Sequence, residues 1–175
     1  MILKTVSGIV AFAAALVVAG AGFAQQPPAN PLDVVPDKMP FDIPYGPAIS
    51  LERADAILAA ALADAKKRDW KLICSVVDSG GALVSLKRMD GAQLASIAIA
   101  EHKARAAAKF RRETKLFENA VQNNIHYILS LDDVIASRGG IPLVDGGKLI
   151  GAIGCSGGTS SQDEVVAKAG VAALK

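Results

Sequence analysis

Residues 139–164 read GGIPLVDGGKLIGAIGCSGGTSSQDE, and this stretch decides the fold of the chain. Two short apolar segments, 141–144 and 148–153, flank the turn residues Asp-Gly-Gly at 145–147. A turn of this composition between two apolar segments is typical of a β-hairpin. We therefore expect the last third of the chain to contain two antiparallel strands.

A helix start follows the hairpin. Ser161 precedes Glu164 by three residues, which is the spacing of a capping box, so we expect a helix from about Gln162. The free N–H groups of a helix start favour an anion, and Gly157 and Gly158 would let its oxygens approach the backbone. A nucleotide loop is not indicated, because neither G-x-G-x-x-G nor Gly-Lys-Ser/Thr occurs. The glycines serve either turns and close strand-to-helix packing or contact with a carboxylate or phosphate.

Composition limits the class of protein. The chain has 175 residues, of which 51% are hydrophobic and 21% charged, enough for one domain with a single core. Aromatic residues make up only 5%, so the interior must consist mainly of Ala, Val, Ile and Leu. The net charge of +2 is small and no basic and aromatic residues alternate, which argues against nucleic-acid binding. Two cysteines and two histidines without ligand spacing argue against a zinc site.

Residues 1–24 are typical of a secretory signal peptide. Lys4 precedes the apolar residues 9–18, and small residues lead to a cleavage site after Ala24. A membrane span needs ~20 mostly apolar residues, so we expect export to the periplasm or medium without stable membrane insertion. In such an oxidising compartment Cys74 and Cys155 could pair. Both lie in apolar, strand-like segments, where two buried free thiols are the alternative.

Residues 25–49 form a proline-rich linker or arm. Seven of the eight prolines lie here, so the segment is extended rather than helical. It is either a flexible tether or an arm that lies along a groove or a neighbouring subunit. The seven are Pro27, Pro28, Pro31, Pro36, Pro40, Pro44 and Pro47.

The domain proper begins near Ser50, a plausible N-cap, and extends to residue 175. Periodicity, alanine content and turn residues predict the remaining elements. They are a helix to about residue 68, antiparallel strands at 70–77 and 82–89, a long helix at 92–110, a solvated charged connection at 111–115, an irregular helical segment at 116–131, a strand or edge piece at 134–137, and a final helix at 162–174.

Arg88 is a candidate ligand-binding residue. Strand alternation places it on the same side as Val84 and Leu86, so we expect its side chain to be partly buried. A partly buried guanidinium needs an acidic partner. Either Asp90 or the carboxylate of a ligand could provide it.

The long helix carries a second group of candidates. His102 lies on an apolar stripe with Ala95, Ala98, Ile99 and Ala106. Its imidazole could ligate iron, accept a proton or form a hydrogen bond within the core. Lys103, beside it, could hold a propionate or another acid, and Glu101 and Arg105 are spaced to pair on the exposed strip.

Five blocks in order, VVDSGGALVSLKRMDGA, EHKARAA, RRETK, GGIPLVDGGKLIGAIGCSGG and QDEVVAKAG, resemble the GlcG/HbpS family of haem-binding or haem-degrading HbpS-like proteins. The resemblance covers about residues 50–174. It implies a profilin-like, three-layer α/β/α domain with a central antiparallel sheet, commonly assembled into homo-oligomers. Members often have Thr where this chain has Ala106, so a possible oxygen ligand is missing, although His102 one turn earlier could substitute.

The functions of the resembled family are diverse. Secreted members bind haem and are linked to redox sensing, related domains accompany corrinoid adenosyltransferases, and others are encoded among catabolic genes. Together with the signal peptide and the placement of His102, Lys103 and Arg88, the resemblance favours an exported protein that binds haem or a related acidic, apolar ligand, with His102 as the expected ligand of the haem iron. The expected ligand-binding residues are Arg88, Asp90, His102, Lys103, Gly157 and Gly158.

Two other functions fit the same residues. The first is a cofactor-independent tautomerase or lyase for a small carboxylate, in which Arg88 holds the acid and the glycine loop stabilises an oxyanion. His102 or Glu101 would then carry the proton. The second is an assembly protein whose alanine-rich helices pack against copies of themselves.

Overall fold

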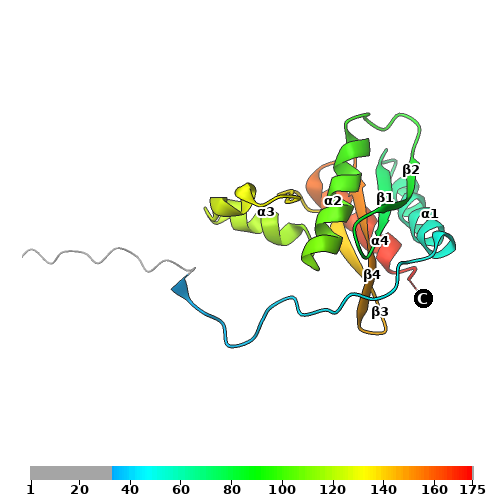
Figure 1. The fold of residues 1–175 in the computed structure, drawn as a ribbon. Helices are drawn as coiled ribbons and strands as arrows, with labels where there is room; N and C mark the ends of the chain where they lie inside the picture. Colours follow the sequence, from blue (N-terminus) through cyan, green and yellow to red (C-terminus); the bar gives the residue numbers. More distant parts are fainter. Residues whose placement is uncertain (1–32, 175) are drawn as a thin grey trace, which may run out of the picture. The chain divides into compact units, whose positions relative to one another are not determined.

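A four-stranded antiparallel sheet forms the middle layer of the fold, which we describe from a computed structural model covering residues 33–174. The strand order is β2-β1-β4-β3, so the hairpin from the glycine-rich stretch forms one edge and the centre of the sheet (Figure 1). The strands are β1 (Ile73–Asp78), β2 (Leu83–Arg88), β3 (Gly140–Asp145) and β4 (Lys148–Ser156).

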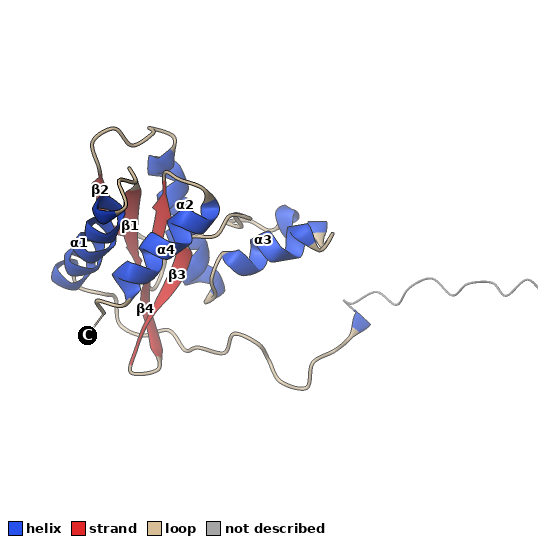
Figure 2. Ribbon diagram, turned by 180° about the vertical axis from the view of Figure 1, so that it is seen from behind, coloured by secondary structure: helices blue, strands red, loops and turns tan. Residues whose placement is uncertain are grey.

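Helices cover both faces of this sheet. Helices α1 (Leu51–Lys67) and α4 (Ser160–Val171) pack on one face and α2 (Ser96–Phe110) packs on the other, as Figures 1 and 2 both show. The predicted three-layer α/β/α architecture is thereby confirmed. Helix α3 (Lys115–Gln122) and the 3₁₀ helix η2 (His126–Ser130) extend away from the sheet beside α2.

The helix caps confirm one prediction and correct another. Ser50 caps α1, since its hydroxyl accepts the N–H of Arg53 at 3.3 Å. The cap of α4 is Thr159 rather than Ser161, and its capping box is completed by Gln162. The helix starts two residues earlier than predicted because the extended backbone of the glycine loop already ends at Thr159.

Three segments differ from the prediction. Helix α2 begins at Ser96, because residues 92–95 form turns after Gly91, whose φ is +77°. Residues 134–137 form no strand, since the chain turns at Asp133 with φ +64° and enters β3 only at Gly140. The connection 111–115 is not simply solvated, because Thr114 is buried and accepts the N–H of Gly140 at 3.0 Å.

Two glycines let α2 lie directly on the sheet. Gly154 and Gly140 are paired in register on β4 and β3. A Cβ on Gly154 would lie 2.1 Å from the carbonyl oxygen of Ala100, and one on Gly140 would lie 2.3 Å from that of Lys103. Both distances are far below van der Waals contact, so these positions require glycine for strand-to-helix packing.

The end of the proline-rich segment is bound to the domain. The N–H groups of Gly46 and Ile49 donate to the carbonyl oxygens of Leu149 and Ile150 at 2.7 and 2.9 Å. Ile43 packs against the core beneath α2. Residues 43–49 therefore lie along the sheet as an arm, whereas the predicted signal peptide lies outside the described residues.

A disulfide joins Cys74 on β1 to Cys155 on β4, and both residues are fully buried. The two cysteines are direct partners in the strand register, which resolves the two alternatives left by the sequence in favour of pairing. None of the helices within residues 33–174 has the length and apolar character needed to cross a membrane.

Candidate functional site

His102 and Lys103 are neighbours in sequence but project from different faces of α2, because consecutive helical residues are rotated by ~100°. The side chain of Lys103 is buried, with 1% of its surface exposed, and its Nζ donates to Oδ2 of Asp163 at 2.7 Å. Lys103 therefore links α2 to α4, and its charge is already matched within the domain.

The glycine loop binds an anion that belongs to the chain itself. Asp163 lies in the first turn of α4, and its Oδ1 accepts the N–H of Gly158 at 3.1 Å. Burial raises the pKa of Asp163, against the opposing effects of Lys103 and of the Gly158 and Gly157 N–H groups. Of the two alternatives for the glycine loop, contact with the anion of a ligand is not favoured, because the N–H of Gly158 already bonds the carboxylate of Asp163. Lys103 and Gly158 thus have structural partners instead of the expected ligand.

Gly157 also has a packing role. Its φ is +149°, and a Cβ there would lie 2.5 Å from the carbonyl oxygen of Lys71. The backbone therefore passes close to the start of β1. This contact explains the glycine without a ligand.

Arg88 is exposed rather than partly buried, because β2 is an edge strand and Arg88 is its last residue. Together with Asp90 it lines a cavity of about 350 Å³ that also includes Lys66 and Asp69 from the end of α1. Within residues 33–174 no ion pair joins Arg88 to Asp90. This cavity lies on the α1 side of the domain, so Arg88 does not converge with His102.

His102 lies on the outer face of α2, in a row with Ala95, Ala98 and Ile99 that we call the outer stripe. Ala95 and Ala98 are exposed, whereas Ile99 and His102 are half-buried. Among the described residues, 33–174, no hydrogen bond or ion pair engages the imidazole. The outer stripe is therefore an accessible apolar surface with one uncommitted nitrogen ligand. Leu94, 69% exposed, extends this apolar surface.

Charged groups bound the outer stripe at its C-terminal end. Nζ of Lys109 donates to Oδ2 of Asp133 at 2.6 Å, and Arg105 pairs with Glu101 as predicted. The hydrogen bond from Lys109 lowers the pKa of Asp133, and the charges of Lys109 and Arg105 act in the same direction. Below this boundary Ala106 is fully buried, so accessibility of the stripe ends near His102.

Residue spacing alone does not identify Asp163 and Asp133 as the partners of Lys103 and Lys109. Asp163 is 60 residues from Lys103, and Asp133 is 24 residues from Lys109. Both pairs depend on tertiary packing, which spacing along the chain does not encode.

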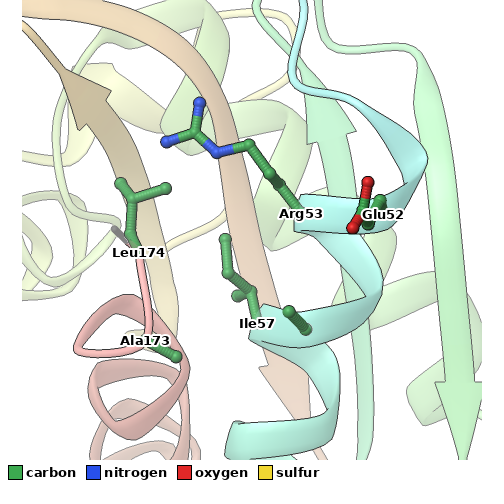
Figure 3. A pocket seen from close by; sticks show the side chains of 6 residues that line it. Glu52, Arg53, Ile57, Ala173 and Leu174 are labelled. Atoms are coloured by element: carbon green, nitrogen blue, oxygen red, sulfur yellow. The ribbon is translucent and has the colours of Figure 1, made fainter.

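Another cavity, about 300 Å³ in volume, lies between the start of α1 and the end of α4 (Figure 3). Arg53 lines it, but its guanidinium bonds the carboxylate of Asp145 at 2.9 Å.

Within residues 33–174, no group of three or more His, Cys, Asp or Glu side chains could hold a metal ion. A single imidazole, such as that of His102 on the outer stripe, can instead ligate a metal whose other ligands belong to a cofactor.

Comparison with known proteins assigns the chain to a protein family. The family model described as "Haem degrading protein HbpS-like" matches residues 49–172. Protein GlcG of Escherichia coli strain K12 is 41% identical over 108 residues, which are 62% of this chain and 81% of GlcG.

Solved structures agree with this assignment. A complex of PduOC with haem has a TM-score of 0.67 and 29% identity, and the alignment covers 73% of this chain and 96% of PduOC. The crystal structure of HbpS has a TM-score of 0.69 and 26% identity, with 79% and 98% covered. The same domain thus occurs in a protein with haem bound.

Proposed function

The chain belongs to the HbpS-like family, and we propose that it is an exported protein that binds haem or a related acidic, apolar ligand. The observation that carries the proposal is the uncommitted imidazole of His102 on the accessible apolar outer stripe. The related structure of PduOC with haem supports the choice of ligand.

The residues of the outer stripe suit this ligand. Imidazole is a common axial ligand of haem iron. The small side chains of Ala95 and Ala98 would let a flat macrocycle approach the helix closely, and Ile99 would add apolar contact. Bound haem would supply an iron centre able to take a further ligand or exchange electrons, and His102 would hold and orient it.

Export is the second part of the proposal. The pattern of residues 1–24 is typical of a signal peptide. A fully buried disulfide between Cys74 and Cys155 is characteristic of oxidising compartments. Fractionation of cells that produce the full chain would test this, since retention of uncleaved chain in the cytosol contradicts it.

Haem binding is testable with a matched pair of variants. Titration of the mature protein with haemin should give a saturable Soret shift, which His102→Ala should weaken at least tenfold. His126→Ala is the control, because His126 is the other histidine of the chain and is exposed on η2. Absence of a saturable shift, or equal losses in both variants, would contradict the proposal.

Self-association is a further part of the proposal. Exposed apolar side chains on and after η2, namely Tyr127, Leu129 and Leu131, offer a surface for a second copy. Sedimentation of the mature protein should give a mass above one chain. A monomer at all concentrations would refute it.

The enzyme alternative has no comparable observation in its favour. The N–H of Gly158, which would have stabilised an oxyanion, already donates to the carboxylate of Asp163.

A further inference from the structure

A cavity of about 460 Å³ lies next to the C-terminal end of α2. Three segments form it: the arm, the connection between α2 and α3, and the edge strand β3. Its volume is within the ~300–1,000 Å³ of sites that hold small organic ligands. The apolar lining comes from Phe41, Ile43, Leu116, Ile141, Pro142 and Val144.

The charged lining of this cavity is mostly cationic. Arg111, Arg112 and Lys115 line it, against a single acid, Glu113. Lys115 forms an ion pair with Glu164, whose Oε1 lies 3.4 Å from its Nζ. The cavity therefore combines apolar walls with an excess of positive charge, which is the complement of an apolar anion.

The two arginines are oriented but not neutralised. Arg111 donates to the carbonyl oxygen of Ile43 at 3.0 Å and lies over the ring of Tyr45. Arg112 donates to the carbonyl oxygen of Phe110 at 3.0 Å and lies 3.5 Å from the ring centroid of Phe41. Within residues 33–174 neither guanidinium meets a carboxylate.

Other arginines of the domain contrast with this pair. Arg53, Arg68, Arg105 and Arg138 each bond a carboxylate of the chain. Burial and the adjacent charge of Arg111 lower the pKa of Arg112, which is the effect of two partly desolvated cations held together. An anion placed between them would relieve this repulsion and gain charge-assisted hydrogen bonds.

We propose that this cavity binds a small apolar monocarboxylate. Its carboxylate meets the guanidinium groups of Arg111 and Arg112, and its hydrocarbon part lies against Leu116, Ile141 and Val144. A single carboxylate fits better than two, because Glu113 repels a second negative charge. None of the residues that line the cavity is a His, Cys, Met or Tyr, so the site is distinct from the iron site proposed at His102.

The test is calorimetric titration of the mature full-length chain with octanoate. We expect saturable binding that is at least tenfold weaker in Arg112→Gln and at least tenfold weaker for octanol, which has the same apolar chain without the charge. Arg68→Gln is the matched control, because the guanidinium of Arg68 already bonds Asp64 and Arg68 does not line this cavity. Its affinity for octanoate should equal that of the parent protein.

A second variant protects the test against loss of folding. Leu116 is 42% exposed, so Leu116→Trp should fold, fill the cavity and block octanoate without changing any charge. Arg112→Gln should retain the Soret shift with haemin, and His102→Ala should retain octanoate binding, which separates the two sites. The proposal is overturned if the parent protein shows no saturable binding of octanoate, or if Arg112→Gln or Leu116→Trp binds it as tightly as the parent.

Discussion

The inner and outer faces of α2 use neighbouring residues in opposite ways. On the inner face Lys103 is almost completely buried and bonds Asp163 at 2.7 Å. On the outer face, one residue earlier, His102 is half-buried and, among residues 33–174, bonds nothing. Of these two adjacent polar residues, Lys103 therefore stabilises the fold and His102 remains available to a ligand.

The difference follows from how closely each face is packed. The inner face lies directly on Gly154 and Gly140, and its residues Ala100 and Ala104 are fully buried. A polar group there must find its partner inside the protein, because water cannot reach it. The outer face carries similarly small side chains, but Ala95 and Ala98 are exposed, because no other element within residues 33–174 covers them. Burial, rather than residue type, therefore separates structural from functional groups on this helix.

The largest effect should come from breaking the inner ion pair. Lys103→Met leaves the Asp163 carboxylate buried without its cation, which should lower the free energy of unfolding by ~3–5 kcal/mol at pH 7. Urea denaturation followed by circular dichroism would measure the loss. Burial already raises the pKa of Asp163, and removal of Lys103 should raise it further. A carboxyl group with a raised pKa becomes protonated, and therefore neutral, as the pH falls. The loss in free energy of unfolding caused by Lys103→Met should therefore become smaller at lower pH.

A double variant sharpens this prediction. Asp163→Asn removes the buried charge, so Lys103→Met combined with Asp163→Asn should be more stable than Lys103→Met alone. Additive losses from the two substitutions would show that the ion pair does not couple α2 to α4. The inner face would then owe its stability to apolar packing alone.

The next largest effect should come from separating α2 from the sheet. Gly154→Ala places a Cβ 2.1 Å from a backbone oxygen of α2, so the helix or the strand must shift. We expect a loss of ~3 kcal/mol in the free energy of unfolding. Gly80→Ala is the control, since its added Cβ would meet only a side-chain oxygen of Asp78 at 3.3 Å. Equal losses in the two variants would contradict close packing as the role of Gly154.

An intermediate effect is expected at the partly buried cluster between α3 and α4. Arg138 donates to both carboxylate oxygens of Glu118 at 2.8 Å. Burial alone would raise the pKa of Glu118, but the backbone and side-chain hydrogen bonds of Arg138 and its charge bring the pKa below its usual value. The resulting stability is present above the usual glutamate pKa of about 4.3 and is lost as the pH falls through the lower, folded-state pKa.

Arg138→Met tests this pH dependence. It should lower the free energy of unfolding by ~2 kcal/mol at pH 7, because hydrogen bonds to a partly buried carboxylate are lost. The difference from the parent protein should narrow as the pH falls below the usual glutamate pKa and through the lowered pKa of Glu118, where the carboxylate becomes protonated. Urea denaturation at pH 7, 5 and 3.5 would measure both results. A difference that is constant over this range would rule out the ion pair as its cause.

Much of the fold was predictable because local patterns determine it. The Ser50 cap and the hairpin after Gly140 follow from capping and turn chemistry and from runs of apolar residues. Helix α2 was placed correctly to within a few residues. Its buried stripe was only partly identified, because alanines occur on every side and do not distinguish the faces.

The candidate site was less predictable for a physical reason. His102 was identified from its residue type, but the partner of Lys103 is 60 residues away. The exposure of Arg88 depends on the place of β2 at the sheet edge. Arg111 and Arg112, whose guanidinium groups meet no carboxylate within residues 33–174, lie in a segment for which the charge pattern alone predicts a solvated connection. Charge partners and cavities arise from tertiary packing, which residue spacing alone does not determine.

The smallest effect on stability should come from the outer face itself. His102→Ala removes a half-buried side chain that makes no hydrogen bond within residues 33–174, so the free energy of unfolding should change by no more than about 0.5 kcal/mol. The same variant should lose at least tenfold in haemin affinity. Urea denaturation beside the Soret titration would measure both. A loss of stability as large as that of Lys103→Met would mean that His102 also serves the core, and the two faces of α2 would no longer differ in role.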